Sequence, residues 1–530
     1  MLEKLIDSVM KARMVGTPLI AIETPDQGAT SKALFKAVAD RAEAKEAPVP
    51  FMFCWDSAQG IRPINEQSKS ALAEMLEPVG GDIEMTINPA LAINVLRTAP
   101  ATTFVVASNL NRFWEDNRLD PQVVQAIWNL RDQFKTSGRT FVMTMPDCSL
   151  PSELRHDVVV FTEDLPTAEE IAPVVRKLHK SASLSDPSDE TVEKATHLLS
   201  GLALQQAEQA CAMSLSKDAD GGLDMDMLRT QQRQQIEQTP GLEIWDGDTT
   251  FDDIKGLDAL TGYLRKVIGA KTKTRAFVFI DEIEKMIAGA TGQGGGDSSG
   301  TSQEQLAYFL NHMQKTNARG ILLVGPAGTG KSEIGKAAGN EADCWTVSCD
   351  VGAMKGSLVG ETGNMTRRAL RVVESLAQGE AFWIATCNSI DSLPPELRRR
   401  FSYGTWFVDL PSDAGRKAIW KHYCKKFNLK ASGASKFNHE GWTGAEIKTC
   451  ASMANDMDID LKEASKFISP VSRSSAETIS KLQTLATGRF MSAEKGGFYK
   501  APEAKSIVDA SDVAPVMSLN AERIMEMDES

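Results

Sequence analysis

Short apolar runs that end in polar residues recur along the chain and predict the strands of parallel sheets. In the second half they lie at residues 276–280, 321–324 and 382–387, and in the first half at residues 19–22 and 103–107. These runs are apolar at successive positions, so both faces of each strand should be buried, as in a parallel sheet covered by helices on both sides. The polar residues that follow each run are the candidates for chemistry.

The run GPAGTGKS at residues 325–332 follows one of these strands and opens a predicted helix at residues 333–340. Its glycines allow backbone N–H groups to curve around an anion, Lys331 can reach the outer phosphates, and the Ser332 hydroxyl can coordinate a metal ion. A glycine-rich turn can arise by chance, but strand, loop and helix coincide here. The sequence therefore predicts binding of ATP or GTP with Mg²⁺ by Gly325, Pro326, Ala327, Gly328, Thr329, Gly330, Lys331 and Ser332.

Two acids, Asp281 and Glu282, follow the strand at 276–280. At the end of a buried strand an aspartate can hold Mg²⁺ directly or through water, and an adjacent glutamate can polarise an attacking water molecule. The same pair can also serve only as a helix cap, but a phosphate-binding loop in the same chain favours the catalytic interpretation. We therefore expect Ser332 and Asp281 to be metal ligands and Glu282 to be catalytic.

An amide and three arginines complete the candidate chemistry. Asn388 follows the strand at 382–387, where it can orient the nucleophilic water near the terminal phosphate. Arg398, Arg399 and Arg400 are consecutive, which suits insertion into the nucleotide site of a neighbouring subunit to stabilise transition-state charge. The alternative for the arginines is a solvated basic turn.

Composition limits the class of protein. The 530 residues suffice for about three or four domains, and no apolar run reaches membrane-spanning length. The start of the chain lacks the pattern of a secretory signal, so a cytoplasmic protein without a membrane segment is expected. The eight cysteines form no CxxC pair and are expected to be reduced. A net charge of −13 disfavours nonspecific binding to nucleic acid.

Residues 245–470 resemble the AAA branch of the AAA+ ATPases. The resemblance rests on the motifs above and on two further segments, 251–257 and 441–447. It implies a P-loop NTPase α/β fold with a parallel sheet and a helical lid, and a ring-shaped homo-oligomer, a hexamer. It also implies that Asn388 is the first sensor and that Arg399 and Arg400 are arginine fingers. The family has two residues between its arginines, so all three consecutive arginines remain candidates here. The remaining nucleotide contacts implied are Asp253, Ile254, Gly444 and Ala445.

The order of the motifs departs from this family. Family members place the Walker B strand after the phosphate loop, whereas Asp281 and Glu282 precede it. Moving residues 275–318 to the junction between Glu380 and Ala381 restores the family order. The moved block is one strand and one helix, so we infer a transposition that leaves the neighbours of each strand unchanged. The prediction is that the strand at 276–280 lies beside the strand at 382–386 with Asp281 facing Ser332, and the alternative is a chain that misfolds.

The first half repeats the second in a degenerate form. Residues 19–32 have the strand, turn and helix of a phosphate loop without its Gly-Lys-Ser core, and Ser108 and Asn109 stand where two acids are expected. Segments 151–155, 161–166 and 199–210 are similar to segments of the second half and follow in the same order. Any α/β domain, however, yields strands at similar spacing. The expected domains are a degenerate AAA-like α/β domain at 1–180, a lid remnant and linker at 181–240, the ATPase core at 241–411, a helical lid at 412–495 and a tail at 496–530.

The whole architecture resembles the Ycf-type AAA ATPases of plastids and cyanobacteria, which adds the plastid stroma as a possible location. The features that carry this resemblance are the degenerate first module, a glutamine-rich linker, a Gly/Ser-rich stretch at 290–302 and the closing segment at 470–488. Three function classes follow: an ATP-hydrolysing remodeller of an unknown protein client, a nucleotide-dependent scaffold or switch with slow turnover, and a nucleic-acid motor or loader. Only aliphatic residues occur at 358–359, where AAA unfoldases carry an aromatic pore residue. This favours the scaffold over a strong threading motor, and the acidity of the chain disfavours the motor on nucleic acid.

Overall fold

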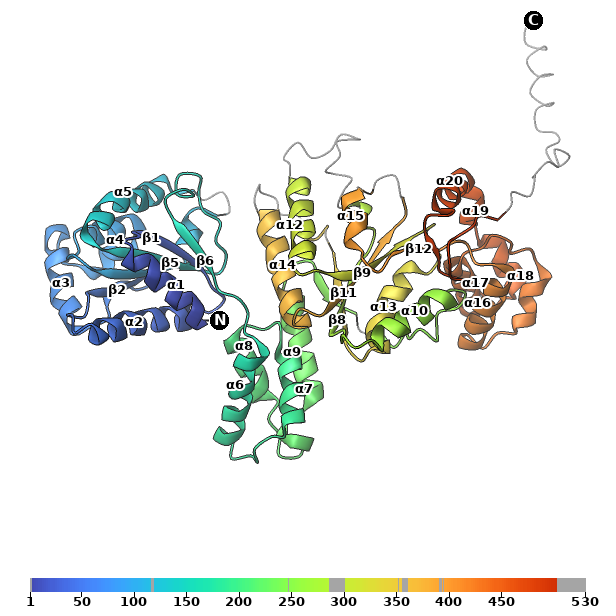
Figure 1. The fold of residues 1–530 in the computed structure, drawn as a ribbon, viewed down its shortest axis with the longest axis horizontal. Helices are drawn as coiled ribbons and strands as arrows, with labels where there is room; N and C mark the ends of the chain where they lie inside the picture. The colour runs from blue at the N-terminus through green and yellow to red at the C-terminus, as the bar shows by residue number, and fades with distance from the viewer. Residues whose placement is uncertain are drawn as a thin grey trace, which may run out of the picture.

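The chain forms two α/β modules joined by a helical bundle, and a smaller helical domain follows the second module (Figure 1). This computed structural model describes residues 2–115, 119–245, 247–285, 301–350, 352–354, 361–389, 393 and 395–502. The Gly/Ser-rich residues 290–300, the aliphatic residues 358–359 and the tail from 503 lie outside this range. Within it, no helix has both the length and the apolar character needed to cross a bilayer.

The first module is a six-stranded sheet of order β3-β2-β4-β5-β1-β6, parallel except between β2 and β3. Adjacent residues on one strand enter different apolar clusters: Val105 faces one cluster and Val106 the other. The sheet is therefore buried on both faces, as the apolar runs predict. Its strands are β1 (Leu19–Glu23), β2 (Met52–Asp56), β3 (Gly60–Pro63), β4 (Phe104–Ser108), β5 (Thr140–Met145) and β6 (Val159–Thr162). Its helices are α1 (Leu2–Met14), α2 (Gln27–Ala44), α3 (Glu66–Leu76), η1 (Glu77–Val79), η2 (Ile83–Ile87), α4 (Pro89–Leu96), η3 (Leu110–Phe113) and α5 (Pro121–Ser137).

Four helices form the bundle between the modules: α6 (Ala168–Ser181), α7 (Asp189–Leu199), α8 (Leu204–Met213) and α9 (Met225–Glu237), with η4 (Asp220–Gly222) before the last. Ile171 and Val175 of α6 share an apolar cluster with residues of α7, α8 and α9. The α/β module thus ends near β6, and α6 lies in the bundle rather than in the α/β domain expected to extend to residue 180. The periodicity of α6 does not distinguish a helix on a sheet from a helix in a bundle, because both bury one apolar face.

The second module is a seven-stranded sheet of order β13-β12-β9-β11-β8-β10-β7. Among the strand pairs of this sheet within the described residues, β7 and β10 run antiparallel and the others run parallel. Its strands are β7 (Leu242–Ile244), β8 (Ala276–Ile280), β9 (Arg319–Val324), β10 (Trp345–Cys349), β11 (Ala381–Cys387), β12 (Thr405–Phe407) and β13 (Met491–Ser492). Its helices are α10 (Asp258–Ile268), α12 (Thr301–Lys315), α13 (Lys331–Glu341), α14 (Glu361–Ala377) and α15 (Pro395–Arg400).

The position of β8 confirms the predicted strand pairing. β8 lies parallel between β10 and β11, with Ala276 opposite both Trp345 and Ala381. Every residue of β8 is buried, and Arg275 N–H donates to the Glu380 carbonyl at 3.1 Å. β8 therefore occupies the interior of the sheet although it precedes β9, β10 and β11 in the chain.

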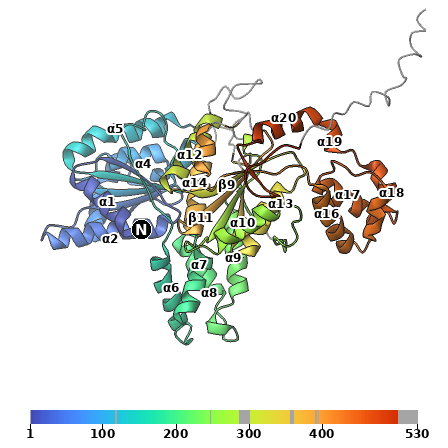
Figure 2. The ribbon, with the colours of Figure 1, turned by 45° about the vertical axis from the view of Figure 1, so that its right-hand side comes forward.

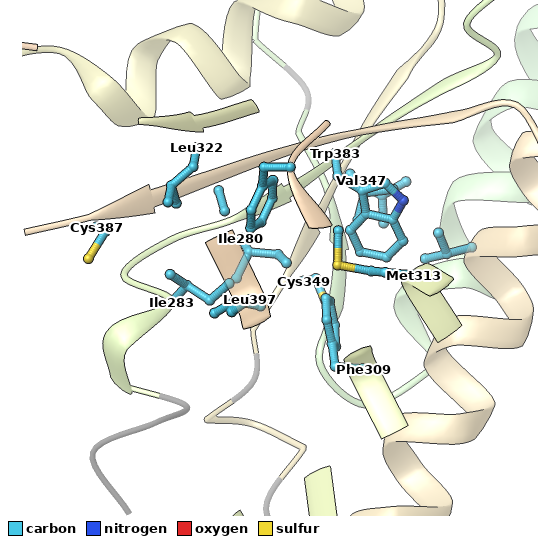
Figure 3. Close-up of a cluster of buried hydrophobic side chains, with 14 of the residues drawn as sticks. Ile280, Ile283, Phe309, Met313, Leu322, Val347, Cys349, Trp383, Cys387 and Leu397 are labelled. Carbon is cyan, nitrogen blue, oxygen red and sulfur yellow. The ribbon is translucent and has the colours of Figure 1, made fainter. Parts of the chain in front are cut away.

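Two apolar clusters cover the two faces of this sheet. On one face, shown in Figure 3, Ile280 of β8 lies in the same cluster as Phe309 of α12 and Trp383 of β11. The Phe309 and Trp383 rings meet edge to face with centroids 5.2 Å apart. On the other face, Phe277 and Phe279 join a cluster with residues of α10 and α13. Alternate residues of one apolar strand thus hold helices on opposite faces.

The helical domain after the second module is shorter than the expected lid at 412–495. It comprises α16 (Asp413–Lys426), η5 (Ala431–Lys436), α17 (Gly444–Asp456), α18 (Leu461–Ala464) and η6 (Ser465–Phe467), with one apolar cluster of its own. After α19 (Val471–Ser474), α20 (Ala476–Ala486) and β13 return to the core. Tyr499 is 6% exposed and packs in the core cluster, so the start of the predicted tail at 496–530 belongs to the core.

The bundle and the first module both contact α14 of the second module. Gln378 Nε2 at the end of α14 donates to Ser200 Oγ at 2.9 Å, and Gly201 N–H donates to Ser375 Oγ at 3.2 Å. Arg371 of α14 forms an ion pair with Glu23 at the end of β1. Figure 2 shows α14 between the first module and the second sheet.

Candidate functional site

The phosphate-binding loop joins β9 to α13 and depends on its glycines. Gly328 and Gly330 have φ angles of 78° and 96°, a region that side chains disfavour. A Cβ atom on Gly325 would lie 2.0 Å from the Val408 carbonyl oxygen, so only glycine fits between the loop and the strand beside it. The loop predicted from GPAGTGKS therefore occurs between a strand and a helix, as expected.

Lys331 begins α13 and points back into the loop. Its ammonium donates to the carbonyl oxygens of Gly325 at 2.7 Å and Pro326 at 2.6 Å. Burial lowers the pKa of Lys331 to about 8, and the nearby carboxylates of Glu284 and Asp281 oppose this shift. The loop thus encloses a desolvated cation at the position where an anion is expected, which strengthens its attraction for a phosphate.

Asp281 follows β8 and links the end of β11 to the start of α13. Its Oδ1 accepts hydrogen bonds from Ser332 Oγ at 3.0 Å and from Thr386 Oγ1 at 2.6 Å. The predicted approach of Asp281 to Ser332 is therefore confirmed. A carboxylate beside a hydroxyl offers the oxygen ligands that Mg²⁺ prefers when it also binds substrate phosphates, so these residues fit the expected metal ion.

Glu282 and Asn388 are brought together next to this pair. Asn388 Nδ2 donates to Glu282 Oε1 at 2.9 Å, and Lys285 forms an ion pair with the same carboxylate. Glu282 has a φ angle of 51°, which is uncommon for a residue with a side chain and is a form of strain found at functional sites. Its N–H donates to Thr386 Oγ1 at 2.9 Å, which supports this conformation.

Sequence reasoning missed two residues of the acidic edge. Thr386 connects Asp281 to the backbone of Glu282. The sequence pattern that could have indicated it is a hydroxyl near the end of an otherwise apolar strand. Glu284 accepts a hydrogen bond from Asn388 N–H at 2.9 Å. The sequence pattern that could have indicated Glu284 is a third acid two residues after Glu282. Thr386 and Glu284 therefore fix the positions of Asp281, Glu282 and Asn388 relative to one another.

The lid reaches the phosphate loop through one turn. Ala445 N–H donates to the Gly328 carbonyl at 3.1 Å, and Gly444 lies over the same carbonyl. A Cβ atom on Gly328 would lie 3.0 Å from Thr443 Oγ1, so glycine permits this approach. The two predicted lid contacts therefore lie directly on the loop that precedes Lys331.

The segment with Asp253 and Ile254, which the family resemblance places against the nucleotide, lies on the side of the sheet that α10 covers. Ile254 is 9% exposed and shares a cluster with Ile334 of α13. Hydrogen bonds from Thr250 N–H and hydroxyl lower the pKa of Asp253, and nearby His422 of the lid contributes to the same shift. His422 is a further residue that sequence reasoning did not select, because a single histidine in a lysine-rich helix gives no pattern.

The three arginines of α15 differ in exposure. Arg399 is exposed, whereas Arg398 and Arg400 are half-buried. Arg400 Nη2 donates to Gln314 Oε1 of α12 at 2.7 Å. The structure therefore directs Arg400 to its own chain and leaves Arg399 accessible to a neighbouring molecule.

The corresponding loop of the first module is filled by its own side chains. Asp26 caps α2 by accepting a hydrogen bond from Ala29 N–H at 2.9 Å. Glu163 Oε2 accepts hydrogen bonds from Thr24 Oγ1 at 2.5 Å and Thr30 Oγ1 at 2.9 Å. Two carboxylates thus occupy the helix N-terminus that would attract a phosphate, which opposes anion binding there.

The two sheets and the loop define the class: a P-loop NTPase fold preceded by a second α/β module of the same kind. Residues 2–163 match the family described as the N-terminal domain of SpoVK-like AAA ATPases. This range ends one residue after β6, in agreement with the end of the first α/β module.

More of the chain is similar to uncharacterized AAA domain-containing proteins named Ycf46. The protein of Trieres chinensis is 25% identical over 411 residues, which cover 68% of this chain and 74% of that protein. The protein of Pyropia yezoensis is 24% identical, with coverage of 69% and 78%. The protein of Guillardia theta is 24% identical, and the match spans 59% of this chain and 63% of that protein, less than two thirds of its length. Together with the fold, these similarities support an AAA+ ATPase that resembles the Ycf46 proteins.

Proposed function

We propose that the second module binds ATP with Mg²⁺ and hydrolyses it to remodel a protein partner or assembly. The observation that supports this most directly is the convergence of Ser332, Asp281, Glu282 and Asn388 at one edge of the sheet, within the distances given above. Asp281 and Glu282 follow β8, Asn388 follows β11, and Ser332 lies in α13 after the loop that follows β9. Their convergence from segments far apart in the chain is unexpected for an unused motif.

Each residue has one role in this proposal. The eight residues of the phosphate loop bind the triphosphate, with Lys331 moving from its carbonyl partners to the outer phosphates. Ser332 and Asp281 hold Mg²⁺, which neutralises phosphate charge when bound. Glu282 polarises the attacking water and Asn388 orients it. The purine base of the nucleotide lies between residues 253–254 and the lid turn at 444–445.

The exposed Arg399 supports assembly as part of the function. A guanidinium that acts on the nucleotide of a neighbouring subunit requires contact between copies of the chain, so we propose a homo-oligomer, with Arg399 as the first candidate finger and Arg400 as the second. The resemblance to the AAA+ family favours a hexameric ring for this assembly. The partner is a protein, and nucleic acid is disfavoured by the net charge of −13. We place the protein in the cytoplasm, or in the stroma of a plastid-containing source.

Two substitutions separate nucleotide binding from turnover. Lys331→Ala should abolish binding of ATP, because it removes the only cation inside the described phosphate loop. Glu282→Gln should bind ATP normally and lower turnover by about 100-fold or more, since the group that polarises water is lost. Isothermal titration and steady-state phosphate release measure the two effects. The matched control is Lys32→Ala in the first module, which should change neither. Normal turnover by Glu282→Gln would exclude residues 281–282 as the Walker B acids.

A second candidate function is a nucleotide-dependent scaffold or switch with slow turnover. The observation that favours it is the engagement of Glu282 by both Asn388 and Lys285. With both partners in place, the Glu282 carboxylate can polarise a water molecule only after those contacts change. If ATP alone drives assembly in the Glu282→Gln variant, and turnover of the native chain stays low at every protein concentration, the scaffold is the better description.

A further inference from the structure

The chain crosses from the ATPase core to the lid through residues 408–412, and the start of this crossing is fixed to the phosphate loop. Val408 N–H donates to the Val324 carbonyl at 2.8 Å. The Val408 carbonyl lies directly against Gly325, where no side chain would fit. At the far end, Ser412 caps α16, the first helix of the lid, by accepting a hydrogen bond from Gly415 N–H at 3.2 Å. If the lid moves relative to the core, the backbone between Val408 and Ser412 is therefore one of the two connections that have to change, the other being the segment between η6 and α20.

Residues 476–502, which we name the C-terminal strap, return from the lid and pack on this crossing. In Figure 2, α20 lies apart from α16, α17 and α18 and close to the sheet. β13 pairs with β12, and Ala493 N–H donates to the Phe407 carbonyl at 3.0 Å. The rings of Tyr499 and Phe407 lie 4.5 Å apart. The strap is thus part of the core in packing, although it follows the lid in sequence.

The strap also binds the polar groups of the crossing. Asp409 accepts hydrogen bonds from Gln483 Nε2 at 2.9 Å and from the Tyr499 hydroxyl at 2.5 Å. Burial and the Asp409 carboxylate together raise the pKa of the Tyr499 phenol, so it remains a donor at physiological pH. Glu494 accepts a hydrogen bond from the Ser412 hydroxyl. Both ends of the crossing are therefore held by the same returning segment.

We propose that the C-terminal strap is a lock on the hinge between core and lid, and that Tyr499 and Gln483 are positioning residues for nucleotide turnover. This inference rests on the proposed ATPase function and adds a control element to it. The lid meets the phosphate loop only through the turn that places Ala445 on Gly328 among the contacts described above. A hinge held at Asp409 and Ser412 keeps this turn in place, and release of the hinge lets the lid open and the nucleotide leave.

The test removes the two donors to Asp409 without removing the packing. Tyr499→Phe keeps the ring on Phe407, and Gln483→Leu keeps the size of the side chain. The matched control is Thr484→Ala, which lies next to Gln483, is exposed, and loses only a hydrogen bond to the Ser480 carbonyl. Each variant is made in the full chain. Hydrogen exchange of residues 408–416 is measured with and without a fluorescent ATP analogue and Mg²⁺, and release of the analogue is followed after dilution.

We expect the Tyr499→Phe/Gln483→Leu chain to exchange amide protons at 408–416 about ten times faster and to release the analogue about three to ten times faster, as the loss of one or two hydrogen bonds to a carboxylate implies. Thr484→Ala should match the native chain. Asp409→Asn, which keeps an acceptor, should lie between them. Unchanged exchange at 408–416 in a folded double variant would overturn the lock, as would faster exchange with unchanged release. If the native chain fails to bind the analogue, the ATPase proposal fails, while the exchange measurement still decides whether the strap holds the hinge.

Discussion

Lys331 is the residue at which the requirements of binding and stability conflict most clearly. It is 5% exposed, and burial lowers its pKa from 10.5 to about 8. Keeping the ammonium charged in the folded chain at neutral pH therefore costs about 3 kcal/mol, because one pKa unit corresponds to about 1.4 kcal/mol. Two backbone carbonyls offset part of this cost in the absence of a phosphate. The loop stores this free energy and recovers it when an anion binds.

This conflict predicts that Lys331→Met stabilises the nucleotide-free chain at pH 7 by about 1 kcal/mol or more while abolishing nucleotide binding. The lysine pKa is lower in the folded than in the unfolded state, so the penalty is fully present below about pH 8 and disappears as pH rises toward 10.5. The difference in unfolding midpoint between the two chains should therefore shrink from pH 7 to pH 10. Denaturant unfolding at several pH values measures it, and a variant less stable than the native chain at pH 7 would contradict the argument.

At the scale of elements, the contact between β8 and α13 is close enough to exclude a side chain on the helix. Gly335 of α13 lies against Phe279, and a Cβ atom at this position would be 2.1 Å from the ring. The helix that carries Lys331 and Ser332 thus rests on the strand that ends at Asp281. The short distance between the Ser332 hydroxyl and the Asp281 carboxylate follows from this close packing.

Gly335→Ala should destabilise the chain by about 1 to 3 kcal/mol, because the added methyl group overpacks the ring of Phe279. The same substitution in an ordinary helix interior stabilises by up to about 1 kcal/mol. Gly262→Ala in α10 is the matched control, since nothing lies within 4 Å of its Cβ position, and it should raise the midpoint of unfolding. Phe279→Leu should recover part of the loss in the Gly335→Ala background. Equal effects of the two glycine substitutions on the thermal midpoint would show that the contact is not tight.

The sequence predicted the elements that carry a strong local signal. The loop at 325–332 followed from glycine spacing, and the burial of β8 and β11 inside a sheet followed from strands apolar on both faces. The pairing of these two strands was implied by the resemblance to the AAA+ family. Thr386 and Glu284 were not predictable in the same way, because their roles depend on which strands become neighbours. The end of the lid was also missed. The helical pattern of α20 is the same whether its apolar face meets the lid or the core, and only the packing of Leu482 and Tyr499 distinguishes these cases.

For the whole molecule, the proposed function requires more than one chain. Arg399 is exposed on α15, while the acids and the phosphate loop lie at the carboxyl edge of the same sheet. The first module also contributes, because Glu23 pairs with Arg371 and its own loop is filled by carboxylates. We therefore expect it to supply contacts rather than a second nucleotide site.

Mixing two inactive chains tests the assembly. An Arg399→Ala/Arg400→Ala chain keeps its phosphate loop, and a Lys331→Ala chain keeps its arginines, so a mixed ring contains some complete sites at subunit boundaries. ATP hydrolysis of the mixture should reach about a tenth or more of the native rate, well above either chain alone. The control mixture pairs Lys331→Ala with Glu282→Gln, which repair nothing at a shared boundary and should stay inactive. Specific activity that survives dilution to a demonstrated monomer would exclude a finger that acts between subunits.

The early position of β8 in the chain has a consequence for biosynthesis. During translation β8 leaves the ribosome before β10 and β11, the two strands that will flank it. Its sequence AFVFI is apolar, uncharged and free of proline, which is the composition of segments prone to intermolecular β-pairing. With residues 275–318 placed between Glu380 and Ala381, as in the family order, β10 would be made before this strand, while β11 would still follow it. Here neither flanking strand has been made when β8 emerges, so we expect the nascent chain to aggregate more readily during synthesis than a chain in the family order.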